Sequence, residues 1–261
     1  MPSLGKLRPR TLWAAPSGPG WGPLPEMLLM LTLVTGLVDA VSILALGRVF
    51  VANMTGNVVF TGFAIAGAPG FSLGASLFAL AGFLMGAGAG GVMTSRVGHD
   101  RALHVRAATS AEFALLAVAL VIAGLSGGAA AVTGTLGIAP GTSPFRTALS
   151  WALAFVLALA LGIQNSAARK LAVPDLTTTV LTMTLTGIGA DIRSGHRVTL
   201  GRRILTVVTM LAGGILGAWL VLNAGVVAPL ALATCLLAVT AACATLAARS
   251  PGDWRAAPAR P

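Results

Sequence analysis

An acidic side chain, Asp39, lies inside the first long apolar stretch of this chain, at about residues 27–46. A carboxyl group in the centre of a membrane helix costs about 2.5–3.5 kcal/mol on insertion scales, so such groups face a protein interior or a water-filled path. Thr32, Thr35 and Ser42 share one helical face with Asp39. This stripe could exchange a proton or bind a cation, and we predict that Asp39 contacts a solute or a coupling ion.

A second cluster of polar residues lies within the apolar segment 50–67. Asn53 and Asn57 contribute amides, Thr55 contributes a hydroxyl, and Gly56 weakens any helix there. Irregular backbone at membrane depth is tolerated only where protein or water covers it, and broken helices bind solutes and ions in transporters. We predict that these four residues bind substrate; the alternative is polar packing between helices.

The same pattern returns in the second half of the chain, where the segment 162–187 resembles 36–62. A gap-free alignment places Asp39 on Gln164, and a one-residue gap moves it onto Asn165. The matched polar positions, which we predict to bind the same substrate, are Asn53 with Thr178, Asn57 with Thr182, and Asp39 with Gln164 or Asn165.

Two further segments, 80–87 and 211–218, read LAGFLMGA and LAGGILGA. Each contains a Gly-x-x-x-Gly spacing, which lets helices pack closely. Three matches in the same order predict a two-fold internal repeat, with copies at about 26–126 and 148–247 in a single domain, 26–247. We expect the glycine surfaces to serve packing inside the protein; a homo-oligomer is the alternative.

Composition places the chain in a membrane. Of its 261 residues, 56% are hydrophobic and 9% are charged, with a mean hydropathy of +0.89, whereas soluble domains are about 45–50% apolar and about 25% charged. A hydrocarbon core about 30 Å thick needs roughly 17–25 apolar residues per helix. We therefore predict an all-α, polytopic transmembrane helix bundle. Its predicted full spans are 27–46, 72–94, 107–126, 148–167, 203–223 and 228–247.

The polar segments 50–67 and 175–190 decide the topology. If both cross the membrane, the chain has eight spans, and its 17 Lys and Arg divide into 11 inside and 6 outside. If each is re-entrant or broken, only Arg48 and Arg146 lie outside and the other 15 lie inside, as short cytoplasmic loops favour. We predict six full spans, with eight as the alternative. Three spans per half would invert the halves, which is typical of transporters.

Polar tails flank this domain. Residues 1–25 are basic and rich in proline, and we predict that they are disordered; we place both termini, including the tail 248–261, in the cytoplasm. The net charge of +10 lies between spans and in the tails, where it sets orientation, so nucleic acid is not an expected partner. The expected partners are the bilayer of a bacterial inner (plasma) membrane and an unknown small-molecule or ion substrate.

Catalytic chemistry finds little support in the sequence. His99, His104 and His196 lie in basic loops, both Cys residues lie in the last span, and no nucleotide-binding, zinc-protease or hydrolase motif occurs. We expect no enzyme, no catalytic residue, no cofactor and no metal. Glu112, near the start of a predicted span, could reach the membrane interface.

The segments GLVDAVSILALGRVFVANMTGN (36–57) and GIQNSAARKLAVPDLTTTVLT (162–182) resemble the YoaK family of bacterial integral membrane proteins. The resemblance covers roughly 27–247 and implies a multi-span inner-membrane protein with about six spans and no established activity. By this resemblance, the family motif falls on Gly36, Asp39, Phe50, Asn53, Met54, Thr55, Gly56, Asn57, Gly162, Gln164, Asn165, Pro174, Thr178, Thr179 and Thr182.

The leading functional hypothesis comes from buried polarity and the repeat. It is a secondary transporter or permease for a small solute, coupled to a proton or cation through Asp39. A passive channel and a non-transporting membrane scaffold remain the alternatives.

Overall fold

Every regular element in the described part of this chain is a helix, which confirms the all-α prediction. The computed structural model describes residues 20–125, 148–174, 176, 178, 181–194 and 197–256, without the side chains at 192–194, 197 and 198. The predicted disordered tail lies mostly outside the described residues, although α1 already begins at Leu24. The helices are α1 (Leu24–Ala45), α2 (Met54–Ile65), α3 (Leu73–Val97), α4 (Arg101–Leu125), α5 (Ala148–Leu171), α6 (Leu181–Ser194), α7 (Arg197–Ala224), α8 (Val227–Arg249) and a 3-10 turn, η1 (Asp253–Arg255).

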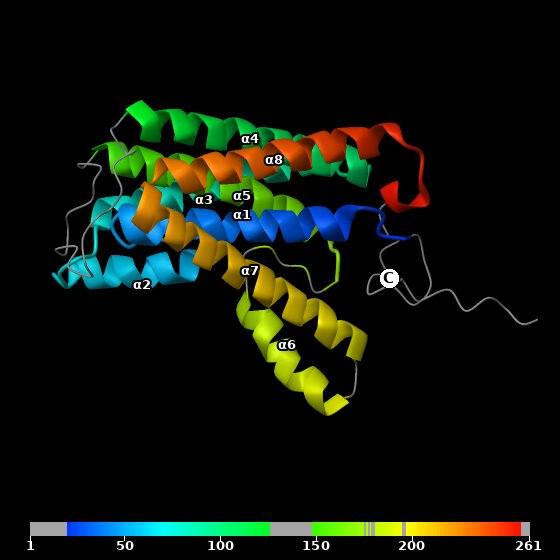
Figure 1. The fold of residues 1–261 in the computed structure, drawn as a ribbon, viewed down its shortest axis with the longest axis horizontal. Helices are drawn as coiled ribbons and strands as arrows, with labels where there is room; N and C mark the ends of the chain where they lie inside the picture. The colour runs from blue at the N-terminus through cyan, green and yellow to red at the C-terminus, as the bar shows by residue number, and fades with distance from the viewer. Residues whose placement is uncertain are drawn as a thin grey trace, which may run out of the picture.

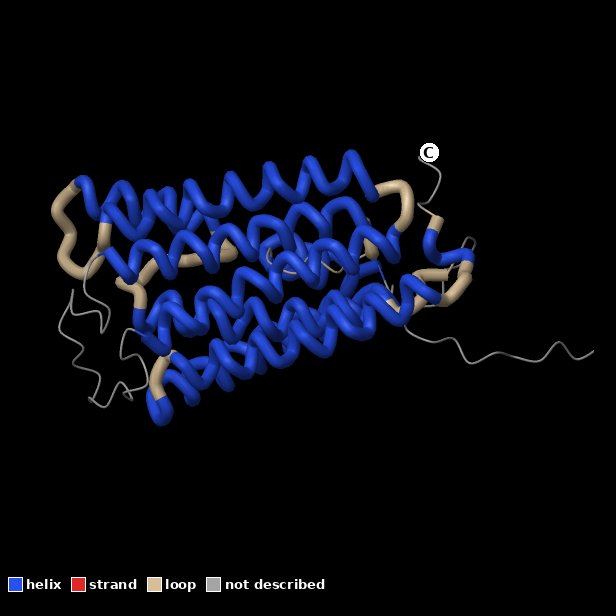
Figure 2. Tube along the Cα trace, turned by 90° about the horizontal axis from the view of Figure 1, so that it is seen from above, coloured by secondary structure: helices blue, strands red, loops and turns tan. Residues whose placement is uncertain are grey.

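Among the residues that the structure describes, six helices are long and apolar enough to cross a membrane: α1, α3, α4, α5, α7 and α8. They lie side by side, with most connections gathered at the two ends of the bundle (Figure 2). The other two helices are short. With 12 residues in α2 and 14 in α6, they reach about 18 and 21 Å, less than the roughly 30 Å of a hydrocarbon core. The six-span prediction is therefore confirmed.

The two halves of the chain run in opposite directions. Helices α1, α4 and α7 share one direction, whereas α3, α5 and α8 run the other way (Figure 1). Because α1 ends where α3 begins, α2 and the chain before it enter and leave at one end (Figure 1). The order of directions in α1, α3 and α4 is thus reversed in α5, α7 and α8.

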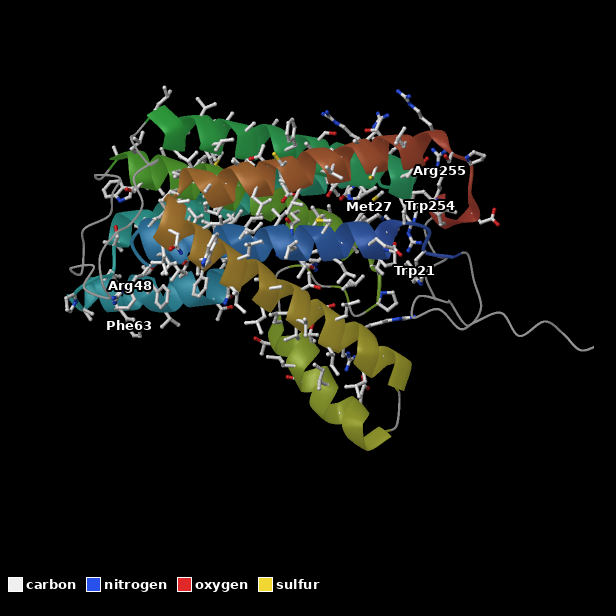
Figure 3. All side chains as sticks on the ribbon, in the orientation of Figure 1. Trp21, Met27, Arg48, Phe63, Trp254 and Arg255 are labelled. Atoms are coloured by element: carbon white, nitrogen blue, oxygen red, sulfur yellow. The ribbon has the colours of Figure 1, made fainter. Side chains whose placement is uncertain are left out.

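Basic residues gather at one end of this bundle. We call it the basic end; its members include Arg96, Arg101, Arg169, Lys170, Arg249 and Arg255. Trp21, Trp254 and Arg255 lie at this end and Arg48 at the opposite one (Figure 3). The C-terminal residues fold back here, because Arg255 forms an ion pair with Asp100. The uneven distribution agrees with the charge argument for six spans.

Helix contacts repeat between the halves. If α1, α2, α3 and α4 correspond to α5, α6, α7 and α8, each contact in one half has a counterpart in the other. The contact α3–α5 matches α7–α1, and α4–α5 matches α8–α1. The contact α2–α3 matches α6–α7. The contacts α3–α4 and α7–α8 form a further matched pair. Of the remaining contacts, α1–α5 and α4–α8 each join equivalent helices, and α4 also contacts η1. A pseudo-two-fold axis therefore relates the halves.

Close glycine contacts set the register of this repeat. An added methyl group at Gly86 would collide with the backbone of Leu159, and one at Gly213 with the backbone of Leu33. Gly86 thus corresponds to Gly213 in the fold, whereas the sequence match pairs Gly82 with Gly213. The true register is shifted by one helical turn, because glycines four residues apart occupy the same face. The glycine surfaces serve packing inside the protein, as predicted.

Candidate functional site

Asp39 lies where the chain re-enters the bundle after α1. It is about 9 Å before the end of that helix, and the backbone N–H groups of Val51 and Ala52 interact with its carboxyl group. The chain therefore returns to the depth of Asp39 before α2 begins. Oδ1 of Asp39 is buried and has no hydrogen-bond partner among the described residues, so it remains an available acceptor.

Asn57 closes this re-entrant turn. The N–H of Phe50 donates to Oδ1 of Asn57 at 2.8 Å, and Nδ2 of Asn57 donates to the carbonyl oxygen of Phe50. Gly56 lies against the Phe50 ring, whose centroid is 5.6 Å from that of Phe60 in a stacked pair. Asn57 and Gly56, both predicted to bind substrate, thus shape the turn that carries the backbone to Asp39.

The structure does not bring every predicted residue to this place. Asn53 and Thr55 are exposed at the start of α2, and Thr182 is exposed on α6. Asn53 occupies the N-cap position of α2 without a side-chain capping bond. Thr178 is different: it is buried, and its hydroxyl has no hydrogen-bond partner among the described residues.

A polar contact joins α1 and α5. Nε2 of Gln164 donates to Oγ1 of Thr35 at 2.9 Å, and both side chains are buried. Thr35 itself donates to the carbonyl oxygen of Leu31 at 2.9 Å. Oε1 of Gln164 is buried without a partner in the described part of the chain. Because α1 and α5 are equivalent helices, this contact lies near the pseudo-two-fold axis, one helical turn from Asp39.

The second half carries an amide where the first carries the acid. Gly36 and Gly162 are equivalent, since each packs directly on the backbone of its neighbour, α7 or α3. Asp39 and Asn165 each follow these glycines by three residues. The structure therefore supports the gapped alignment. Gln164 faces α1, and Asn165 lines a cavity between α3 and α5.

Glu112 is a deeper acid than the sequence suggested. Its helix begins at Arg101, so Glu112 lies about 17 Å from that end. It is fully buried, and neither carboxyl oxygen has a hydrogen-bond partner among the described residues. The expectation that it reaches the interface is wrong. His104, expected in a loop, is likewise buried in α4. Thr109 lies three residues before Glu112, on the same helical face, and is also buried. This polar pair in the sequence could have indicated that Glu112 faces the protein interior.

Comparisons with known proteins agree with this architecture. A family model described as "Protein of unknown function (DUF1275)" matches residues 27–243. The UPF0700 transmembrane protein YoaK of Bacillus subtilis (strain 168) is 34% identical over 166 residues, which cover 64% of this chain. The aligned part spans 66% of that relative, just under two thirds of its length. No solved structure matches. The resemblance to the YoaK family is confirmed.

Proposed function

This chain belongs to the DUF1275 family of proteins of unknown function, and we propose that it is a secondary transporter for a small solute. The observation that carries this proposal is the meeting of two inverted halves at the buried Thr35–Gln164 contact. Inverted halves can exchange conformations, so that a site on their axis opens to one side of the membrane and then to the other.

The chemistry of the contact favours a ligand that donates hydrogen bonds. Oδ1 of Asp39 and Oε1 of Gln164 are buried acceptors without partners in the described residues. A buried polar group left unpaired costs about 1–3 kcal/mol, and a donor on the solute, or a proton, would offset that cost. We therefore favour an amine, another donor-rich solute or a small cation, with Asp39 as the coupling group.

Transport can be tested with the purified full-length chain in liposomes that contain a pH-sensitive dye. We expect one member of a panel of amines, polyols and amino acids to cause a saturable pH change, and Asp39→Asn to abolish it. Ser95→Ala is the control, because Ser95 is exposed on α3 and its hydroxyl donates to the carbonyl oxygen of Val92 in the same helix. Unchanged flux and pH dependence in Asp39→Asn would contradict the coupling role. Flux that neither saturates nor moves protons would favour a passive channel.

Orientation needs a separate experiment. We propose that the basic end faces the cytoplasm of a bacterial plasma membrane, since Lys and Arg concentrate in short cytoplasmic loops. In a variant without Cys235 and Cys243, Pro69→Cys should react with a membrane-impermeant reagent from outside, and Gly189→Cys only from inside. Labelling of position 69 from inside would contradict the proposed orientation.

A further inference from the structure

A cavity of about 410 Å³ lies between α3 and α5 near the basic end, apart from the α1–α5 contact. Its α5 wall is polar and basic, with Ser166, Arg169 and Lys170, and Thr94 faces them from α3. None of the described side chains that line it is acidic. Guanidinium, ammonium and hydroxyl groups together form the donor set that binds phosphate oxygens.

The cavity continues into the apolar depth of the bundle. Along α3 its lining extends from Thr94 to Phe83, about 17 Å of helix. Ala87 and Gly91 lie between them, and an added methyl group at Gly91 would meet nothing within 4 Å. Leu84 is 66% exposed on the same helix, so this surface of α3 faces lipid. The cavity thus has a basic outer part and an apolar inner part.

We infer that this cavity binds a phosphate-bearing amphiphile, with its phosphate at Arg169 and Lys170 and its chain against Phe83 and Ala87. Basic pockets between helices on the cytoplasmic side bind acidic lipid headgroups in this way. The helix dipole alone would favour basic residues at the C-terminus of α5. It does not explain why the cavity continues along the apolar residues Phe83 and Ala87. An anionic lipid and a free phosphate share the headgroup chemistry; the apolar part favours the lipid.

The experiment uses the full chain in nanodiscs of phosphatidylcholine, with or without phosphatidylglycerol of the same acyl chains. The measurements are Tm and the lipid retained in native mass spectra. We expect phosphatidylglycerol to be retained and to raise Tm. A parallel series adds inorganic phosphate to phosphatidylcholine nanodiscs, which separates a lipid from a soluble ligand. Binding is measured directly, so the result does not depend on transport.

Two pairs of variants localise the effect. Gly91→Leu fills the cavity, whereas Gly88→Leu is the matched control, since Gly88 also has open space but does not line it. The second pair compares R169Q/K170Q with R96Q/R249Q, which removes the same charge from exposed residues at the same end. Each basic residue that contacts an anionic headgroup contributes about fivefold to the affinity, so R169Q/K170Q should weaken phosphatidylglycerol binding roughly 25-fold. R96Q/R249Q should change the binding far less.

The outcomes separate clearly. Retention of phosphatidylglycerol that Gly91→Leu and R169Q/K170Q both reduce supports a lipid ligand. A rise in Tm with inorganic phosphate alone, lost in R169Q/K170Q, supports the anion site with a soluble source. Equal retention of the two lipids with no effect of phosphate, or equal losses in test and control variants, overturns the inference. If Gly91→Leu does not fold, R169Q/K170Q still decides between these results.

Discussion

The two short helices occupy equivalent places in the two halves, yet they are held in different ways. The turn before α2 is closed by two hydrogen bonds between Asn57 and the backbone of Phe50. Among the described helices, α6 packs only on α7, to which Asp191 and Arg203 tie it through an ion pair of 3.0 Å. It diverges from the rest of the bundle (Figure 1).

This difference shows which segment is suited to move. The side chain of Asn57 is buried and its two hydrogen bonds with Phe50 join neutral groups, so salt and pH leave them intact. The side chains of Arg203 and Asp191 are 21% and 13% exposed, and salt weakens an ion pair that water reaches. We therefore expect the first segment to hold Asp39 in place, and the second to move in the proposed transport cycle.

The largest effect should come from Asn57→Ala. This change removes the partner of the N–H and of the carbonyl oxygen of Phe50, at up to about 1–3 kcal/mol for each, since both bonds are partly buried. Thr182→Ala, at the position that the sequence alignment pairs with Asn57, should change stability by less than about 0.5 kcal/mol, because Thr182 is exposed. The measurement is thermal unfolding in detergent. Equal losses in the two variants would remove the contrast between the segments.

A smaller contrast is expected between two glycines. At Gly56 an added methyl group meets the ring of Phe50, which is stacked on Phe60, and such overpacking costs about 1–3 kcal/mol. At Gly187 it meets the guanidinium group of Arg203, the end of a flexible side chain. Gly187→Ala should therefore cost less than Gly56→Ala, because the Arg203 side chain can turn away and only its partly buried ion pair with Asp191 is weakened. Denaturant titration of both alanine variants tests this order; a larger loss at Gly187 contradicts it.

The smallest effect concerns pH at the basic end. Burial acts to raise the pKa of Asp100, but hydrogen bonds from Arg255 and from the backbone N–H groups of Leu103 and Ala102 outweigh it and lower that pKa. A carboxyl group whose pKa is lowered by folding stabilises the folded state at pH values above its unfolded pKa of about 4. This contribution is lost as the pH falls through its folded pKa. Acid should therefore release the C-terminal residues from Asp100, while the Asn57 contacts remain.

The mobility of a spin label measures this release. In a variant without Cys235 and Cys243, a nitroxide on Ala256→Cys, a position that is exposed, should be more mobile below about pH 4 than at pH 7. Adding Asp100→Asn should make the label mobile at both pH values. A pH-independent mobility with Asp100 present would show that this contact does not hold the C-terminal residues.

Part of the candidate site could be predicted from the sequence. A helix places every third or fourth residue on one face, so Thr35 and Asp39 were correctly expected to lie together in the interior. Periodicity does not say which neighbour that face meets. The pairing of Gln164 with Thr35 and the depth of Glu112 depend on how α4 and α5 pack, and hence on contacts distant in sequence.

The sequence by itself determined the six apolar spans, the two short polar segments and the inverted repeat, because span length and charge distribution follow directly from composition along the chain. Only the tertiary structure decided what the polar residues do. Asn57 binds the backbone of Phe50, and Thr182 lies on the surface of α6. The physical reason is that a polar side chain is satisfied by whichever donor or acceptor the fold brings within about 3 Å, and residue type cannot specify that partner.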